Sequence, residues 1–151
     1  MEKQMIMGKA ALAATMTTVL SCLGYKGILG LIWLLAMALD YISGTAAAMK
    51  EGAWQSSMAR AGLFHKAGMM LSVAVAGVGD LAMTMVLGNI PLINMRWPGA
   101  LLPLVLSWYI LTELGSVLEN AIKLGAPVPK WLMTILKTGR EAVDQQAQEN
   151  T

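Results

Sequence analysis

The sequence predicts an all-α integral membrane protein with three transmembrane helices, a short N-terminal membrane helix and a cytoplasmic amphipathic helix near the C-terminus. Three apolar runs, residues 27–49, 67–88 and 99–118, are each long enough at about 1.5 Å per residue to cross a hydrocarbon core of roughly 30 Å. Hydrophobic residues make up 56% of the chain and charged residues only 13%, whereas about 25% of a soluble domain is charged. The 151 residues leave room for one membrane domain, residues 1–143, and a polar tail.

Residues 5–24 precede the first run and form the predicted N-terminal membrane segment. They are mostly small and apolar, with Lys9 near the start and several hydroxyl side chains further on. The tetrapeptide at residues 24–27 is typical of a turn, because glycine stands at both of its ends. We therefore expect a helical hairpin made by this segment and residues 27–49, and a secretory signal peptide is the alternative.

Each apolar run carries one acidic residue, and these are Asp40, Asp80 and Glu113. A carboxylate at bilayer depth costs roughly 2.5–3.5 kcal/mol on insertion scales, so it is expected to face protein or water rather than lipid. Two interpretations stay open for Asp40. It either makes a hydrogen bond between helices or lines a water-filled path.

The first run has small residues on one helical face. Ala36, Asp40, Gly44 and Ala48 recur every four residues, a spacing that lets two helices approach closely. We expect this face to meet another helix. Trp33 lies off this face and is suited either to packing on a neighbouring helix or to contact with lipid.

The second run contains the longest pattern in the chain. Six small or polar residues recur at four-residue spacing, namely Gly68, Ser72, Ala76, Asp80, Thr84 and Gly88. One interpretation is tight packing of this stripe against a neighbouring helix. The other is a pore-facing or oligomer-facing surface that becomes hydrated, because the stripe is longer than a small-residue helix contact needs.

The third run becomes polar toward its end, and Gly125 followed by Pro127 and Pro129 predicts where its helix stops. The polar side chains near this end are candidates for the same role as those of the first two runs, which is pore lining or helix association. The candidates for pore lining or helix association are Asp40, Gly44, Gly68, Ser72, Ala76, Asp80, Thr84, Glu113, Ser116 and Asn120.

An amphipathic helix is predicted for residues 129–143. Its expected apolar side holds Trp131, Leu132, Ile135 and Leu136. We expect this helix to lie on an anionic leaflet, with residues 144–151 forming a disordered polar tail. The expected membrane-surface residues are Lys130, Trp131, Lys137 and Arg140.

The distribution of basic residues predicts the topology. If residues 5–24 span the membrane, every lysine and arginine except Lys26 and Arg96 lies in a cytoplasmic segment. If they do not span it, Lys3 and Lys9 move to the outer side. The positive-inside rule therefore favours four spans with both termini in the cytoplasm.

Several function classes find no support in the sequence. A formal net charge of +2 is too small for a nucleic-acid footprint. One cysteine and one histidine offer no metal-ligand spacing. The chain has no nucleophile–base pairing and no glycine-rich phosphate loop, so we expect neither an enzyme nor a bound cofactor.

Two motifs resemble the toxin-secretion/phage-lysis holin family. The first is the stretch at residues 39–44 with the Lys-Glu-Gly at 50–52, and the second runs from residue 113 to 120 and on to the Gly-x-Pro-x-Pro at 125–129. The resemblance covers about residues 35–136. After the Asp-Tyr of the first motif, serine stands where the family more often has threonine. In the second motif, leucine stands between Glu113 and Gly115, which is a small departure from the family pattern.

This resemblance implies a small phage-encoded protein of the bacterial inner membrane that accumulates and then oligomerises into lesions. A cytoplasmic endolysin would reach the cell wall through these lesions without needing direct contact with the protein. The expected partners are thus other copies of the chain and the lipid bilayer. On this basis Asp40 and Asp80 are expected on association or pore-lining faces, and the motif at 113–120 is expected to fix the last span against its neighbours.

Two other function classes compete with this interpretation. A small ion channel or proton-coupled transporter also uses intramembrane carboxylates, but it passes ions without releasing protein. A scaffold subunit of a larger membrane complex passes nothing by itself.

Overall fold

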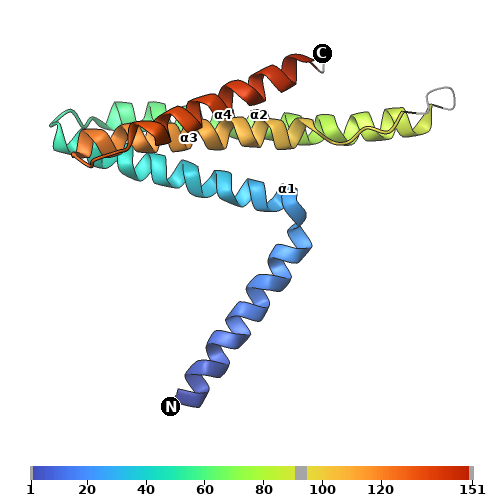
Figure 1. Cartoon of the computed structure of the whole chain (residues 1–151), viewed down its shortest axis with the longest axis horizontal. Helices are drawn as coiled ribbons and strands as arrows, with labels where there is room; N and C mark the ends of the chain where they lie inside the picture. Colours follow the sequence, from blue (N-terminus) through green and yellow to red (C-terminus); the bar gives the residue numbers. More distant parts are fainter. Residues whose placement is uncertain (1, 91–94, 150–151) are drawn as a thin grey trace.

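The computed structural model describes the backbone of residues 2–90 and 95–149, with side chains for residues 5–9, 24–90 and 95–148. The described residues form four helices, which are α1 (Glu2–Lys50), α2 (Ser56–Asn89), α3 (Leu101–Leu124) and α4 (Lys130–Glu149) (Figure 1). Neither described range contains a strand. The predicted all-α class is confirmed.

Three helical segments are long and apolar enough to cross a membrane. They are Gly24–Lys50, Ser56–Asn89 and Leu101–Leu124, so the three predicted transmembrane helices are confirmed. The second is longer than the predicted run, because the preceding residues from Ser56 join the same helix. At about 1.5 Å per residue it is roughly 50 Å long, and it extends beyond a hydrocarbon core of roughly 30 Å.

The predicted N-terminal hairpin does not form. Within α1 only Gly24 has non-helical angles (φ 62°, ψ −178°), so the chain kinks there instead of turning back. Glycine tolerates this positive φ because it has no Cβ. Figure 1 shows the segment before the kink leading away from the other helices. Insertion of residues 5–24 into a membrane therefore stays a prediction.

Helix α3 lies at the centre of the bundle and packs against the other three helices, whereas α1 and α2 touch each other over a short stretch. Lys26 of α1 lies beside Gly99, just before α3 begins, and Lys50 at the other end of α1 reaches the last carbonyls of α3. These two contacts show that α1 and α3 run parallel. Helix α2 connects them by running in the opposite direction, from the end of α1 back to the start of α3, where its Asp80 lies.

The core forms where the three spans meet. Trp33 and Met37 of α1, Met69 of α2, and Leu106 and Ile110 of α3 are buried together. The ring of Trp33 stacks on Tyr109 with 6.2 Å between ring centroids. Only 4% of Trp33 is exposed. Of the two expectations for this side chain, packing on a neighbouring helix is therefore correct and contact with lipid is not.

The small-residue face of the first span meets α3, as predicted. Ala36 is buried, and Asp40, Gly44 and Ala48 are each partly buried. A Cβ at Gly44 would lie 3.4 Å from Nδ2 of Asn120 on α3. A Cβ here would therefore make an ordinary van der Waals contact with Asn120, whereas a longer side chain would push the two helices apart.

Helix α4 differs from its prediction in length. It begins at Lys130, as expected, but continues to Glu149. The residues from 144 to 149, for which we expected disorder, are therefore helical, while residues 150 and 151 lie outside the described part of the chain.

The apolar side of α4 also differs from the predicted one. Leu132 and Leu136 are partly buried together with Met133, whereas Trp131 is 63% exposed and Ile135 58% exposed. The helix turns these last two side chains away because its inner face is centred on Leu136. The expected apolar group is thus split between the inner face and the exposed flank.

Candidate functional site

An ionic cluster joins all three membrane-spanning helices. The ammonium group of Lys66 on α2 lies 2.9 Å from Oδ2 of Asp40 on α1 and 2.6 Å from Oε2 of Glu113 on α3. Glu113 is only 4% exposed. Charges at membrane depth are tolerated when they pair with one another inside a bundle, and this arrangement meets that condition.

Asn120 extends this cluster by about two turns of α3. Its Nδ2 donates hydrogen bonds to Oδ1 of Asp40 and to Oγ of Ser43, both at 3.2 Å. The same amide nitrogen lies against Gly44. The structure therefore brings four of the predicted site residues together, namely Asp40, Gly44, Glu113 and Asn120.

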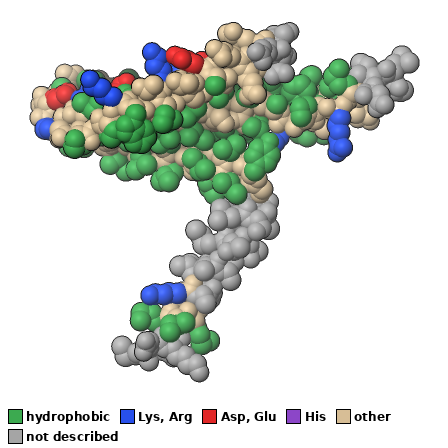
Figure 2. Space-filling model, in the orientation of Figure 1, with side chains coloured by type: hydrophobic (Ala, Val, Ile, Leu, Met, Phe, Trp, Pro, Cys, Tyr) green, Lys and Arg blue, Asp and Glu red, His purple; other side chains and the backbone are tan. Residues whose placement is uncertain are grey.

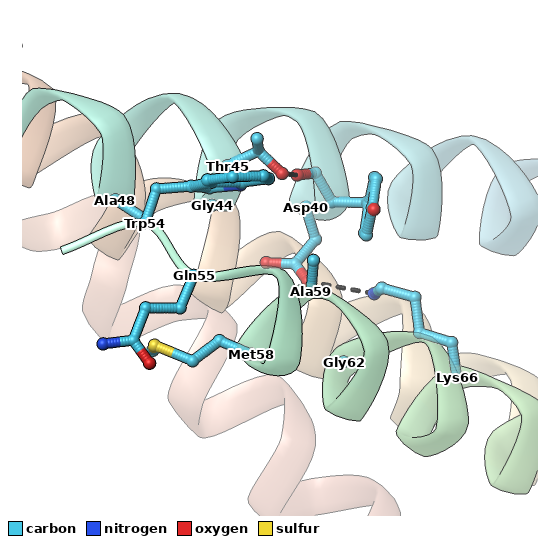
Figure 3. Close-up of a pocket in the computed structure, with 11 residues that line it drawn as sticks. Asp40, Gly44, Thr45, Ala48, Trp54, Gln55, Met58, Ala59, Gly62 and Lys66 are labelled. Carbon is cyan, nitrogen blue, oxygen red and sulfur yellow. Dashed lines mark hydrogen bonds and ion pairs between the residues drawn. The ribbon is translucent and has the colours of Figure 1, made fainter.

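Open pockets flank the ionic cluster on two sides. A pocket of about 210 Å³ between α1 and α2 is bordered by Asp40 and Lys66, which point toward each other in Figure 3. A second pocket, of about 710 Å³, lies between α2 and α3 and is also lined by Asp40 and Lys66. The predicted residues Gly68, Ser72 and Ser116 line this second pocket.

Asp80 occupies a different position, at the start of α3. Its carboxylate accepts hydrogen bonds from the backbone N–H groups of Leu101 at 3.0 Å and Leu102 at 3.1 Å, and from the indole N–H of Trp97 at 2.9 Å. It is 6% exposed. A carboxylate is stabilised at a helix N-terminus by unpaired N–H groups and by the helix dipole.

With this arrangement, every backbone N–H group in the first turn of α3 has a hydrogen-bond acceptor. Asp80 accepts from Leu101 and Leu102, Pro103 has no N–H group, and the N–H of Leu104 bonds to the carbonyl of Ala100 at 3.1 Å. Asp80 thus acts as an N-terminal cap supplied by a neighbouring helix.

Lys26 completes the environment of Asp80. Its ammonium group lies 3.4 Å from Oδ2 of that carboxylate. A Cβ built on Gly99 would come within 2.5 Å of the Lys26 nitrogen, and Gly99 also has a positive φ of 69°. The positive φ therefore favours glycine at position 99, whereas a Cβ there would require only the flexible end of the Lys26 side chain to shift.

The other end of α3 is capped by a cation. Gly125, with φ 94°, ends the helix, and the N–H of Ala126 bonds back to the carbonyl of Ala121 at 2.9 Å. Lys50 of α1 donates to the carbonyls of Lys123 at 3.2 Å and Leu124 at 2.7 Å. Helix α3 thus has an acid at its N-terminus and a base at its C-terminus, as its dipole favours. The predicted stop at Gly125 is confirmed.

The four-residue stripe of the second span does not form one continuous face. At 3.6 residues per turn, each four-residue step rotates by about 40°, so a long stripe winds around its helix. Ala76 and Asp80 in its middle are buried, whereas the members on either side of them are exposed. These exposed members are Gly68, Ser72, Thr84 and Gly88.

The stripe's hydroxyl groups bond within their own helix. Oγ of Ser72 donates to the carbonyl of Gly68 at 3.2 Å, and Oγ1 of Thr84 donates to the carbonyl of Asp80 at 2.7 Å. Oγ of Ser116 on α3 donates to the carbonyl of Thr112 at 3.2 Å in the same way.

Sequence reasoning misses Lys66, the residue at the centre of the cluster. It stands just before the apolar run and looks like a loop residue, but α2 is already helical there. The requirement of Asp40 and Glu113 for a cationic partner at the same depth is the signal that points to it. The capping role of Lys50 is also missed, because it depends on the parallel packing of two distant helices.

The four residues expected at the membrane surface belong to α4, and their contact with a membrane stays a prediction. The guanidinium carbon of Arg140 lies 5.5 Å from the ring centroid of Trp108 on α3, a cation–π contact. Lys130, Trp131 and Lys137 are exposed. Among the described residues, no group of three or more histidine, cysteine, aspartate or glutamate side chains is placed to hold a metal ion.

Comparison with known proteins gives one family. Residues 16–141 match the sequence model of the bacteriophage holin family. No curated protein matches the chain, and no solved structure matches it.

Proposed function

Since the chain belongs to the bacteriophage holin family, we propose that it oligomerises in the inner membrane of a bacterial host and forms lesions that admit a cytoplasmic endolysin to the cell wall. Its required partners are other copies of itself and the lipid bilayer. The endolysin is a functional partner that needs no direct contact. Release of a toxin by the same route is a variant of this function.

The observation that carries this proposal is the ionic cluster of Lys66, Asp40 and Glu113. It lets the three spans of one chain pack as a compact bundle in which the charges of this cluster are paired internally. Such a bundle can accumulate in a bilayer without opening it. Assembly then depends on concentration, because association of copies follows mass action.

The candidate residues act in helix association within this account. Asp40 and Glu113 hold the first and last spans to Lys66 of the second. Asn120 holds the last span to the first, and Asp80 holds the second span to the start of α3. The compact chain is therefore a defined starting state for assembly.

The proposed topology places the loop after Lys50 and the loop after Leu124 in the cytoplasm. Both lie at the same end of the parallel helices α1 and α3, and the positive-inside rule favours this orientation. The start of α4 lies at this same end, but the structure places Gln146 beside Pro98 at the opposite end of α3, so a cytoplasmic C-terminus requires α4 to lie away from the start of α3. If residues 5–24 also span, the N-terminus lies in the cytoplasm.

The direct test is induced expression of the chain in bacteria with and without a cytoplasmic muralytic enzyme. Culture turbidity and escape of a large cytoplasmic reporter are followed together. We expect sudden clearing that requires both proteins, with release of the reporter. Depolarisation with no reporter release and no dependence on the enzyme contradicts the proposal.

A small ion channel or proton-coupled transporter is the second candidate. The observation that favours it is that Asp40 and Lys66 line two open pockets on different sides of the same cluster. A water-filled path through these two pockets would pass ions but not proteins. Selective ion flux that Asp40→Asn abolishes, with the reporter retained in the cell, would establish this alternative.

A further inference from the structure

Helix α4 runs back along the flank of α3 over most of its length. A Cβ on Gly139 would lie 3.4 Å from Cδ1 of Leu111 in the middle of α3, and Arg140 lies over Trp108. Further along, Gln146 lines a pocket together with Pro98 and Pro103 at the start of α3. Because α3 is long and apolar enough to span the membrane, α4 docked on it lies at membrane depth.

The two faces of docked α4 differ in chemistry. Its inner face toward α3 is partly buried and apolar, and consists of Leu132, Met133, Leu136, Gly139 and Val143. Its outer face is exposed, with Lys137 and Asp144 at one edge. At about 100° per residue, the side chains pointing most directly away from α3 are Trp131, Thr134, Thr138, Glu141 and Gln145. Ile135 stands at the edge opposite Lys137, so the outer face is polar beyond Ile135.

This outer face is unsuited to hydrocarbon. Polar side chains find no hydrogen-bond partners in lipid, and charged residues at membrane depth face protein or water. Figure 2 shows acidic and basic side chains along the edge where α4 lies and charged side chains at both ends of the bundle, with hydrophobic side chains over its middle. Docked α4 therefore needs water on its outer side.

The opposite side of the bundle is suited to lipid. Leu35 and Ile42 of α1 are 61% and 65% exposed, and Leu71 and Val75 of α2 are 70% and 71% exposed. The molecule thus has one long polar flank and a broad apolar surface on its other sides. A protein that borders lipid on one side and water on the other requires this distribution of apolar and polar surface.

We propose that the outer face of docked α4 is the water-lining surface of the opening that several copies of the chain form together. This inference rests on the proposed function. In the assembly, each copy turns α4 toward a common aqueous space and its exposed α1 and α2 surfaces toward lipid. The paired acids Asp40 and Asp80 remain inside each bundle and do not line the opening.

The experiment uses the full chain with its one cysteine removed, Cys22→Ser, reconstituted in dye-loaded lipid vesicles. Single cysteines are introduced at Thr138 and Gln145 on the outer face of α4. Glu51→Cys, in the exposed loop after α1, is the matched control because it accepts the same label away from α4. Val75→Cys is the lipid-facing control. Each variant is treated with a bulky maleimide–polyethylene glycol that cannot cross a bilayer.

We expect the attached polymer to slow dye release several-fold at Thr138 and Gln145, because it occupies the aqueous space. The same label at Glu51 should leave the rate unchanged, and Val75→Cys should remain unlabelled. Equal release rates for labelled Thr138→Cys, Gln145→Cys and Glu51→Cys would overturn the inference while leaving the proposed function intact. Failure of the Cys22→Ser parent to release any dye would overturn the proposed function and the inference with it.

Discussion

At the scale of single residues, each intramembrane acid has defined partners within the chain. Asp80 accepts hydrogen bonds from two backbone N–H groups of α3 and from Trp97, and Asp40 and Glu113 share Lys66. Asp40 makes contacts between helices in this compact state, and it also borders two open pockets, so its lining of a water-filled path stays a prediction. The sequence located the acids correctly but could not identify their partners, which lie far away along the chain.

Replacing Asp80 tests its capping role. Asp80→Ala removes the acceptor of three partly buried hydrogen bonds, and an unsatisfied donor costs about 1–3 kcal/mol when it is buried. We expect the free energy of unfolding in detergent micelles to fall by about 2–4 kcal/mol, measured by circular dichroism, with a smaller loss for Asp80→Asn. Glu51→Gln, which changes an exposed acid, is the control. If Asp80→Ala and Glu51→Gln have equal stability, Asp80 is not the cap.

The cluster around Lys66 makes a second prediction. Lys66→Met leaves two carboxylates without their cation, and breaking a buried ion pair in this way costs about 3–5 kcal/mol. The triple variant Lys66→Met, Asp40→Asn, Glu113→Gln removes those charges and should recover much of the lost stability. Thermal unfolding of both variants in micelles provides the measurement. A triple variant no more stable than Lys66→Met would show that charge pairing is not what the cluster contributes.

At the scale of helices, the sequence predicts which helices form better than it predicts how they are arranged. The three spans and the stop at Gly125 follow from apolar length and from glycine and proline chemistry, and the structure has them. The hairpin at residues 24–27 was wrong because one glycine in an otherwise helical stretch kinks the chain without reversing it. The disordered tail was wrong in part because α4 continues to Glu149.

Glycines of the two predicted small-residue faces have different roles in the structure. A side chain at Gly44 would meet Asn120, whereas nothing lies within 4 Å of a Cβ at Gly68. We expect Gly44→Leu to separate α1 from α3 and lower the unfolding temperature in micelles, while Gly68→Leu leaves it nearly unchanged. Equal destabilisation by the two variants would mean that α2 packs inside the chain along its whole stripe.

At the scale of the whole molecule, charge and apolar surface are distributed in a way that suits two states. Internally paired acids and an apolar outer surface on α1 and α2 suit a chain dispersed in lipid. The polar flank along α4 suits a chain that borders water. Composition predicts a membrane protein of this kind, but only the packing of α4 on α3 reveals which flank is polar.

The proposed function requires that this chain alone opens a membrane to protein-sized molecules. The most direct measurement reconstitutes the purified chain in vesicles loaded with an ion indicator, a small dye and a protein-sized dextran, at increasing ratios of protein to lipid. The account predicts little leakage at low ratios, then steep release of all three markers together above a threshold. Release of the ion signal alone at every ratio, with dye and dextran retained, would contradict it and establish a small channel instead.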